Sequence, residues 1–236
     1  MEPYFFQGVV LPERAQLSSQ MAVKFTHFTS GRAATAAVSI VLNQLAVWVD
    51  TDDEWDVLDL RNVVKTIVEN HLAMVGYIKG YAYDLEITRV VNRARNVDFV
   101  FGIDIPCLAN RNKDAGIALS KLKPKTIGPN GIYINRCLND LANAMRRADD
   151  TAFYCYRAIE SLCNHSSVVH SLESANGEQQ WQKFREIAGC EKETLLEIKG
   201  AADPLRHGKV VQMTSDDRAA LFGKTWDVVD KYLAAV

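Results

Sequence analysis

The first half of the chain alternates apolar and polar residues with a period of two, the pattern of half-buried β-strands. In YDLEITRVV, Tyr83, Leu85 and Ile87 fall on one face, and NVDFVFGID alternates in the same way. The polar segment NRARN between these stretches predicts a hairpin turn. MAVKFTHF and AAVSIVLNQLAVWVD, further upstream, are also strand-like. In the second of these the apolar phase shifts at Asn43–Gln44, which predicts a bulge or a bend.

One long helix is predicted within this strand-rich half, over residues 56–80. Apolar residues recur at helical spacing in DVLDLRNVVKTIVENHLAMVGYIKG. The helix follows an acidic cluster and ends at Lys79 and Gly80, a cation and a helix-terminating glycine. His71 lies on its apolar side, where a hydrogen-bonded core histidine is expected. A mostly antiparallel sheet packed by one helix makes residues 1–105 an α+β domain.

The second half changes to a helical period. Residues 106–128 contain two prolines and the basic run Lys121, Lys123 and Lys125, and they are interpreted as a linker with a short helix near 114–122. From residue 129 onward, five stretches with a period of 3.6 predict five helices joined by short loops. The predicted fold class is therefore α+β, with an all-α bundle over residues 129–236.

Composition and charge narrow the function classes. With 48% apolar residues, 24% charged residues and a net charge of −2, the chain is typical of a globular protein. It is not typical of a general nucleic-acid coat or a membrane-surface protein. Residues 111–236 contain 16 acidic and 18 basic residues, which permits a local anionic partner. There is no apolar run of membrane-spanning length and no secretory signal pattern, and the five cysteines predict buried free thiols in a reducing cytoplasm.

The segment AADPLRHGKVVQ carries the strongest candidate chemistry. Pro204 is expected to break or kink the preceding helix, and Gly208 permits a tight turn. Arg206, His207 and Lys209 can neutralise the carbonyl groups at a helix end. Alternatively, His207 can exchange a proton with a ribose 2′-hydroxyl or a leaving oxygen, while Arg206 holds the scissile phosphate. The second interpretation is the chemistry of RNA cleavage without a metal.

Two more charged residues, Arg157 and Glu160, are three positions apart in YCYRAIESL and share one helix face. They form either an intrahelical ion pair or part of a polar pocket that also contains Arg206 and His207. Lys209 and the three lysines of the linker are candidate RNA contacts. CNHSSVVH lacks a second ligand pair at zinc-like spacing, and the chain has no phosphate-binding glycine loop, so neither a metal nor a cofactor is predicted.

A helical bundle with YRAIESL in an early helix and RHG before a final amphipathic helix resembles the HEPN superfamily, especially the HEPN-like domains of bacterial anti-phage and toxin-type proteins. The resemblance covers residues 129–236. It implies a dimer through the bundle, with an endoribonuclease cleft at the dimer interface in active members. Their motif is an arginine, four to six further residues, and a histidine. His207 and Gly208 match its end, whereas residues 200–202 contain no arginine and Arg206 directly precedes His207.

Two functions follow. The first is a metal-independent endoribonuclease of toxin or antiviral defence type, with His207 as the acid and base and Arg206 as the phosphate clamp. Arg157 and Glu160 would organise its cleft. The alternative is a catalytically inactive HEPN-like module for dimerisation or for binding RNA, a nucleotide or a protein. Both imply a cytoplasmic homodimer without a membrane partner, and the N-terminal domain is a candidate site for a protein partner.

Overall fold

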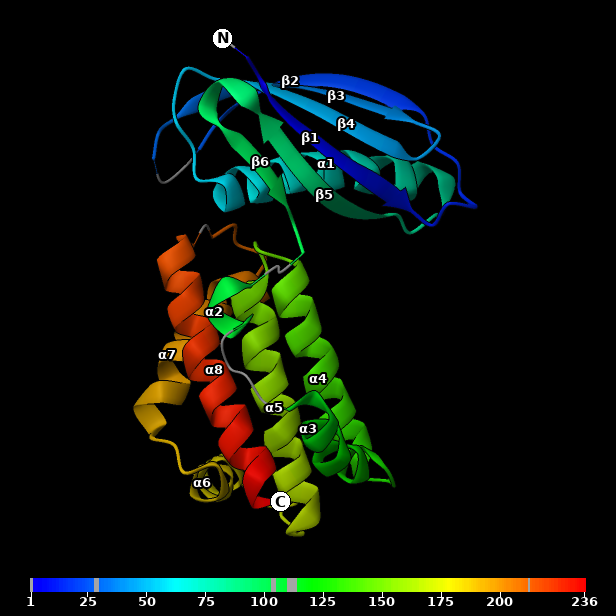
Figure 1. Cartoon of the computed structure of the whole chain (residues 1–236). Coiled ribbons are helices and arrows are strands. Elements are labelled where there is room, and N and C mark those ends of the chain that lie inside the picture. Colours follow the sequence, from blue (N-terminus) through cyan, green and yellow to red (C-terminus); the bar gives the residue numbers. More distant parts are fainter. Residues whose placement is uncertain (1, 28–29, 103–104, 110–113, 212) are drawn as a thin grey trace. The chain divides into compact units, whose positions relative to one another are not determined.

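The computed structural model describes residues 2–27, 30–102, 105–109, 114–211 and 213–236. It divides into two compact units, Met1–Gly102 and Ile103–Val236. The first unit contains an antiparallel sheet and one long helix, and the second is helical (Figure 1). The predicted α+β class is thereby confirmed. None of the helices in the described parts of the chain is both long enough and apolar enough to span a bilayer.

Six strands form the sheet of the first unit within the described residues, in the order β2-β3-β4-β1-β5-β6. All paired neighbours are antiparallel. The predicted hairpin around NRARN is confirmed, because a short 3-10 helix, η1 (Arg93–Arg95), joins the last two strands. The strands are β1 (Tyr4–Leu11), β2 (Ser19–Thr26), β3 (Ala33–Val41), β4 (Gln44–Asp50), β5 (Asp84–Asn92) and β6 (Val97–Val100).

The phase shift near Asn43 is a hairpin turn, so the predicted bulge or bend is wrong. Leu42 and Asn43 both have positive φ, 47° and 68°, and the chain reverses there from β3 into β4. Two consecutive positive-φ residues suit the right-handed twist of the flanking strands. The Asn43 side chain is buried, accepts a hydrogen bond from the Leu17 N–H at 2.6 Å and donates to the Val10 carbonyl at 2.9 Å. A polar residue thus anchors the turn to two other segments of the unit.

The bulge of this sheet lies in β5 instead. Gln7 pairs with Arg89 and Gly8 pairs with Ile87, so Thr88 is the extra residue. Backbone approaches closely here, because a Cβ atom on Gly8 would lie 2.3 Å from the Glu86 carbonyl oxygen. A substitution at Gly8 would therefore push β1 and β5 apart.

Helix α1 (Val57–Lys79) covers one face of the sheet and matches the predicted helix closely (Figure 1). The Asp56 carboxylate caps its start by accepting two backbone N–H bonds at 2.9 Å. Gly80, with φ of 71°, ends it. As expected, His71 is partly buried and hydrogen-bonded, with its Nε2 atom 2.8 Å from the Ser19 hydroxyl. The buried apolar residues of α1 are Leu60, Val64, Val68 and Leu72.

The second unit contains the five predicted bundle helices, with α5 packed against α4, α6, α7 and α8 (Figure 1). The segment interpreted as a linker, residues 106–128, carries the predicted short helix together with two further helical turns. It is not an extended connector, since its elements pack on α4 and α8. The elements are α2 (Pro106–Ala109), α3 (Ala115–Leu122), the 3-10 helix η2 (Lys123–Thr126), α4 (Gly131–Arg146), α5 (Thr151–Val169), α6 (Gly177–Ala188), α7 (Lys192–Arg206) and α8 (Ser215–Ala235).

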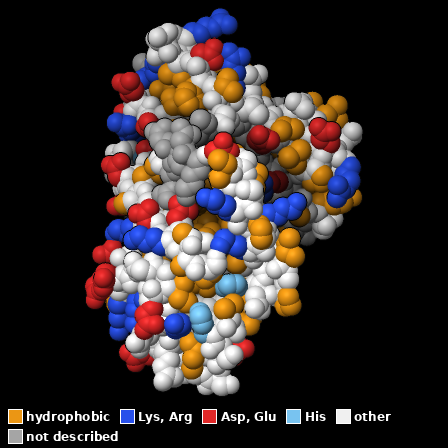
Figure 2. Space-filling view, turned by 60° about the horizontal axis from the view of Figure 1, so that its bottom comes forward, with side chains coloured by type: hydrophobic (Ala, Val, Ile, Leu, Met, Phe, Trp, Pro, Cys, Tyr) orange, Lys and Arg blue, Asp and Glu red, His pale blue; other side chains and the backbone are white. Residues whose placement is uncertain are grey.

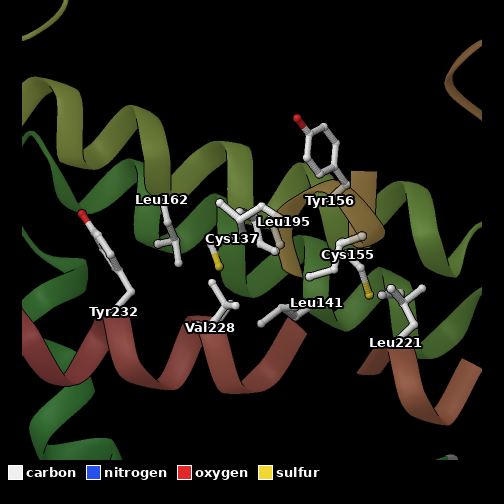
Figure 3. Packing of buried hydrophobic residues seen from close by; sticks show 14 of the residues in the cluster. Cys137, Leu141, Cys155, Tyr156, Leu162, Leu195, Leu221, Val228 and Tyr232 are labelled. Atoms are coloured by element: carbon white, nitrogen blue, oxygen red, sulfur yellow. The ribbon is translucent and has the colours of Figure 1, made fainter. Parts of the chain in front are cut away.

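The core of this unit lies among α4, α5, α6, α7 and α8, and Figure 3 shows Cys137 and Leu162 beside Val228 of α8. All five cysteines are free, and three of them are buried. Burial raises the pKa of Cys155 and of Cys163 to about 12, so both thiols stay protonated at neutral pH. They act as small apolar residues of the core rather than as nucleophiles.

Candidate functional site at the end of helix α7

The RHG segment forms the C-terminal end of α7. Arg206 is the last helical residue, His207 is the cap, and Gly208 has a φ of 72°. The Lys209 N–H bonds to the Pro204 carbonyl at 2.9 Å, and the Gly208 N–H bonds to the Leu205 carbonyl at 3.0 Å. This pair of bonds is the Schellman motif, in which a left-handed glycine satisfies the last helical carbonyls. The HG dipeptide therefore has a structural role that is independent of any chemistry.

Pro204 does not break α7, so of the predicted break or kink the break is wrong. The helix continues for two residues beyond it. The missing N–H of Pro204 removes one hydrogen bond, to the carbonyl of Gly200, which lies on the exposed side of the helix. Because the next residues already end the helix in a Schellman motif, the loss is local.

Arg206 lies between two carboxylates. Its Nη1 atom is 3.2 Å from Asp203 Oδ1, and its Nη2 atom is 3.5 Å from Glu160 Oε1 on α5. The guanidinium also lies over the Tyr156 ring, 5.4 Å from its centroid. The structure thus brings together Arg206 and Glu160, which are 46 residues apart in the sequence. The resulting contact joins the end of α7 to the middle of α5.

Burial dominates the electrostatics of this contact. It raises the pKa of Glu160, although the positive charges of Arg206 and Lys199 act in the opposite direction. Burial, and then the charge of Glu160, also raises the pKa of Tyr156 to about 12, so its hydroxyl remains protonated at neutral pH. The contact holds two carboxyl groups, one phenol and one guanidinium at a helix crossing.

Arg157 does not join this group. Its guanidinium binds Asp140 of α4 through two hydrogen bonds, one of which joins Nε to Oδ2 at 2.9 Å. This pairing raises the pKa of Arg157 further. The predicted partnership of Arg157 with Glu160 is thus replaced by an ion pair between α4 and α5. Asp140 was not predicted as a functional residue. The sequence pattern that could have indicated it is a single carboxylate on the apolar helix face that contains Cys137 and Leu141.

His207 has an exposed side chain with no side-chain hydrogen bond or ion pair to the described residues. Lys209, Lys121 and Lys123 are exposed as well, whereas Lys125 donates a hydrogen bond to the main-chain oxygen of Val236. On the face shown in Figure 2, basic and acidic side chains are interspersed with apolar ones. The structure therefore joins Arg206 and Glu160, leaves His207 at the surface, and gives Arg157 a different partner.

A pocket of about 310 Å³ lies beside this contact, among α5, α6 and α7. Tyr156 forms one of its walls and packs nearly parallel to Trp181 of α6, with 6.2 Å between the ring centroids and 13° between the planes. This pocket was not predicted from the sequence. The pattern that could have indicated it is an aromatic residue and a cation on one helix face, since Trp181 and Arg185 are four residues apart. The lining residues are Tyr156, Glu178, Trp181, Arg185, Lys192, Leu195, Leu196 and Lys199.

The fold and this site define a two-unit α+β protein with a polar helix crossing and an adjacent pocket in its helical unit. Residues 4–101 match the model of the DUF8168 N-terminal domain, and residues 119–236 match that of the DUF8168 C-terminal domain, both described as domains of unknown function. The chain therefore belongs to the DUF8168 family. Neither a curated protein nor a solved structure matches it.

Proposed function

We propose that the C-terminal unit is a HEPN-like helical module that binds an anionic ligand and does not cleave RNA. The observation that carries this proposal is the state of Arg206, which is already held by the carboxylates of Glu160 and Asp203. A scissile phosphate would have to compete with both of them for the guanidinium. Such competition is unfavourable for a group that must stabilise the charge of a transition state.

Likeness to the HEPN superfamily is supported by the order of the elements. YRAIESL lies in α5, RHG ends α7, and the long α8 follows. The same unit offers cations for an anion elsewhere. Arg185, Lys192 and Lys199 border the pocket beside Tyr156, and no ion pair joins them to a carboxylate within the described ranges. Binding of an anion is thus better supported than its cleavage.

His207 can act as a general acid or base only if a second group holds the phosphate beside it. In one chain its nearest candidate clamp, Arg206, is turned toward α5 and its two carboxylates. Nuclease activity would require a second protomer that brings its own arginine to His207. We therefore keep dimerisation through the bundle and a cytoplasmic location as parts of the proposal, the latter supported by the five free thiols. A protein partner for the first unit is a further part of it.

A nuclease assay tests the first half of the proposal. Total tRNA is incubated without metal with the wild type, His207→Ala and His170→Ala, the last being a matched exposed histidine at the end of α5. We expect no cleavage above background in any sample. Cleavage by the wild type and by His170→Ala, abolished in His207→Ala with unchanged circular dichroism, would establish a ribonuclease and overturn the proposal.

Thermal unfolding tests the second half. The melting temperature is measured with adenosine triphosphate, with a short single-stranded RNA and with uncharged adenosine. A ligand that binds only the folded state raises the melting temperature, and the increase grows with the ratio of ligand concentration to dissociation constant. We expect at least one of the two anions to raise it and adenosine to leave it unchanged. Equal melting temperatures in all samples would contradict anion binding.

A further inference from the structure

We infer that the pocket between α5, α6 and α7 is the binding site for a small aromatic anion, a single planar ring system carrying a carboxylate or a phosphate. The inference rests on the proposed function, because it names the site and the class of the anionic ligand. It follows from three independent features of the pocket: its cations, its aromatic wall and the end of the helix that opens into it.

The charge of the pocket is unbalanced. Arg185, Lys192 and Lys199 face a single acidic lining residue, Glu178, which is exposed. Arg185 and Lys199 are half-buried, and in the described part of the chain neither makes an ion pair or a side-chain hydrogen bond, although the charge of Glu160, outside the lining, acts on Lys199. A half-buried cation that makes no ion pair has lost part of its hydration and gains from an anion placed beside it. The pocket therefore favours a negatively charged ligand.

The aromatic wall adds a preference for a ring. Tyr156 and Trp181 already stack on each other, so a ligand ring would pack on the outer face of Trp181 rather than between the two. Leu195 and Leu196 supply the apolar floor. A volume of about 310 Å³ is at the low end of small-molecule sites, which favours a ligand no larger than a mononucleotide.

The N-terminal turn of α7 also favours an anionic ligand. Lys192 is its first residue, and the preceding Glu191 makes no side-chain hydrogen bond to the backbone N–H groups of the first turn. These N–H groups are therefore not satisfied by a capping side chain. A helix N-terminus attracts negative charge through those groups and through the helix dipole. Because Lys192 and Leu195 both line the pocket, an anion there lies close to this turn.

Calorimetric titration of the full chain tests the inference with four compounds. Benzoate and adenosine monophosphate carry both a ring and an anion, benzyl alcohol carries only the ring, and inorganic phosphate carries only the charge. We expect one or both of the ring anions to bind more tightly than benzyl alcohol and phosphate. Binding of benzoate alone identifies a carboxylate ligand, and binding of adenosine monophosphate alone identifies a phosphate ester.

Three variants locate the site. Lys192→Gln and Lys199→Gln each remove one cation of the pocket, and we expect about tenfold weaker binding, the loss of one charge-assisted hydrogen bond. Lys183→Gln is the matched control, since Lys183 lies on α6, pairs with Glu186 and does not line the pocket. Lys192 is exposed, so its substitution does not threaten folding.

Each other outcome is decisive. If phosphate binds as tightly as the ring anions, or if none of the four compounds binds, the inference is overturned. If an anion binds the wild type and both pocket variants equally well, this site is overturned, while anion binding by the unit stands. Weakening by Lys183→Gln to the same extent would indicate only a general charge effect and would also contradict the inference.

Discussion

Three arginines of the second unit each hold helices together, and the groups around each arginine determine which helices it joins. Arg157 ties α4 to α5 through the buried carboxylate of Asp140. Arg206 ties the end of α7 to α5 through Glu160, and Arg218 binds the end of α4. Each guanidinium also lies over an aromatic ring, at 5.0 to 5.4 Å from a centroid. The planar guanidinium of arginine can stack on a ring and donate several hydrogen bonds at the same time. It therefore suits these helix crossings better than the ammonium group of lysine.

Glu160 gives a pH-dependent prediction at this scale. Its pKa is raised above 4.5 in the folded protein, chiefly by burial, so the folded state binds its proton more tightly than the unfolded state. The folding free energy from this group is therefore present at low pH and is lost as the pH rises from about 4.5 through the folded pKa. We expect Glu160→Gln, which stays neutral, to gain stability relative to the wild type over that interval.

Urea unfolding from about pH 4 to pH 7 measures this difference. The matched control is Glu173→Gln, an exposed carboxyl outside the contact, which sets the baseline. A difference between Glu160→Gln and the wild type that is constant with pH, or that grows in favour of the wild type, would show that the ion pair with Arg206 outweighs burial.

At the scale of elements, one side chain near the start of α8 ties this helix to the C-terminal end of α4. Arg218 Nε donates to the Thr151 hydroxyl at 2.8 Å, and Nη2 donates to the carbonyls of Ala144 and Met145 at 3.2 and 3.0 Å. It thus satisfies carbonyl groups at the C-terminal end of α4, which have no helical partner. We expect Arg218→Ala to lower the free energy of unfolding by about 1–3 kcal/mol, since three partly buried hydrogen bonds are lost and only the Ala144 carbonyl keeps a second donor, the Thr151 hydroxyl.

The matched control for this change is Lys224→Ala on the same helix. Lys224 pairs with Glu197 at the surface, and such a pair contributes less than about 1 kcal/mol. Denaturant unfolding compares the two variants. A loss in Arg218→Ala no larger than that in Lys224→Ala would mean that solvent replaces the hydrogen bonds of Arg218 fully.

Periodicity was sufficient to predict most helices, because their burial pattern is local. The α1 stripe and its caps, Asp56 and Gly80, are all readable within one stretch of chain. Two errors concern the strands. The parity shift at Asn43 is the same whether a strand bends or reverses, and only the pairing of β3 with β4 distinguishes them. β1 was missed because Phe5, Val9 and Leu11 on its less buried face are also apolar, which hides the alternation.

The candidate site was less predictable, because it is made by contacts between helices. One alternative offered by the sequence was a polar pocket of four residues, Arg157, Glu160, Arg206 and His207. The structure joins only Arg206 and Glu160, and spacing could not show that Asp203 and Tyr156 complete their surroundings. Arg157 was assigned to the wrong carboxylate, since Asp140 is on another helix. The pocket draws its walls from three helices, and no single helix contributes more than half of the lining residues.

At the scale of the whole molecule, each unit has its own apolar core. One cluster is built from β-strands and α1, and the other from α4 to α8 with Ile105, and the two share no residue. A loss of packing in one core is therefore not transmitted through a shared cluster. Stability in such a chain is a property of each unit rather than one value for the molecule.

Asn43→Ala tests this separation. The substitution removes a buried side chain that makes hydrogen bonds to Leu17 and Val10. Alanine also tolerates the positive φ of this turn position less well than asparagine does. We expect faster amide hydrogen exchange throughout residues 4–101 and unchanged exchange in α4 to α8. Asn43→Gly, which accepts the backbone angle but lacks the side chain, should show part of the effect. Equal acceleration in both units would instead reveal that they unfold together, so that the sheet unit stabilises the helical one.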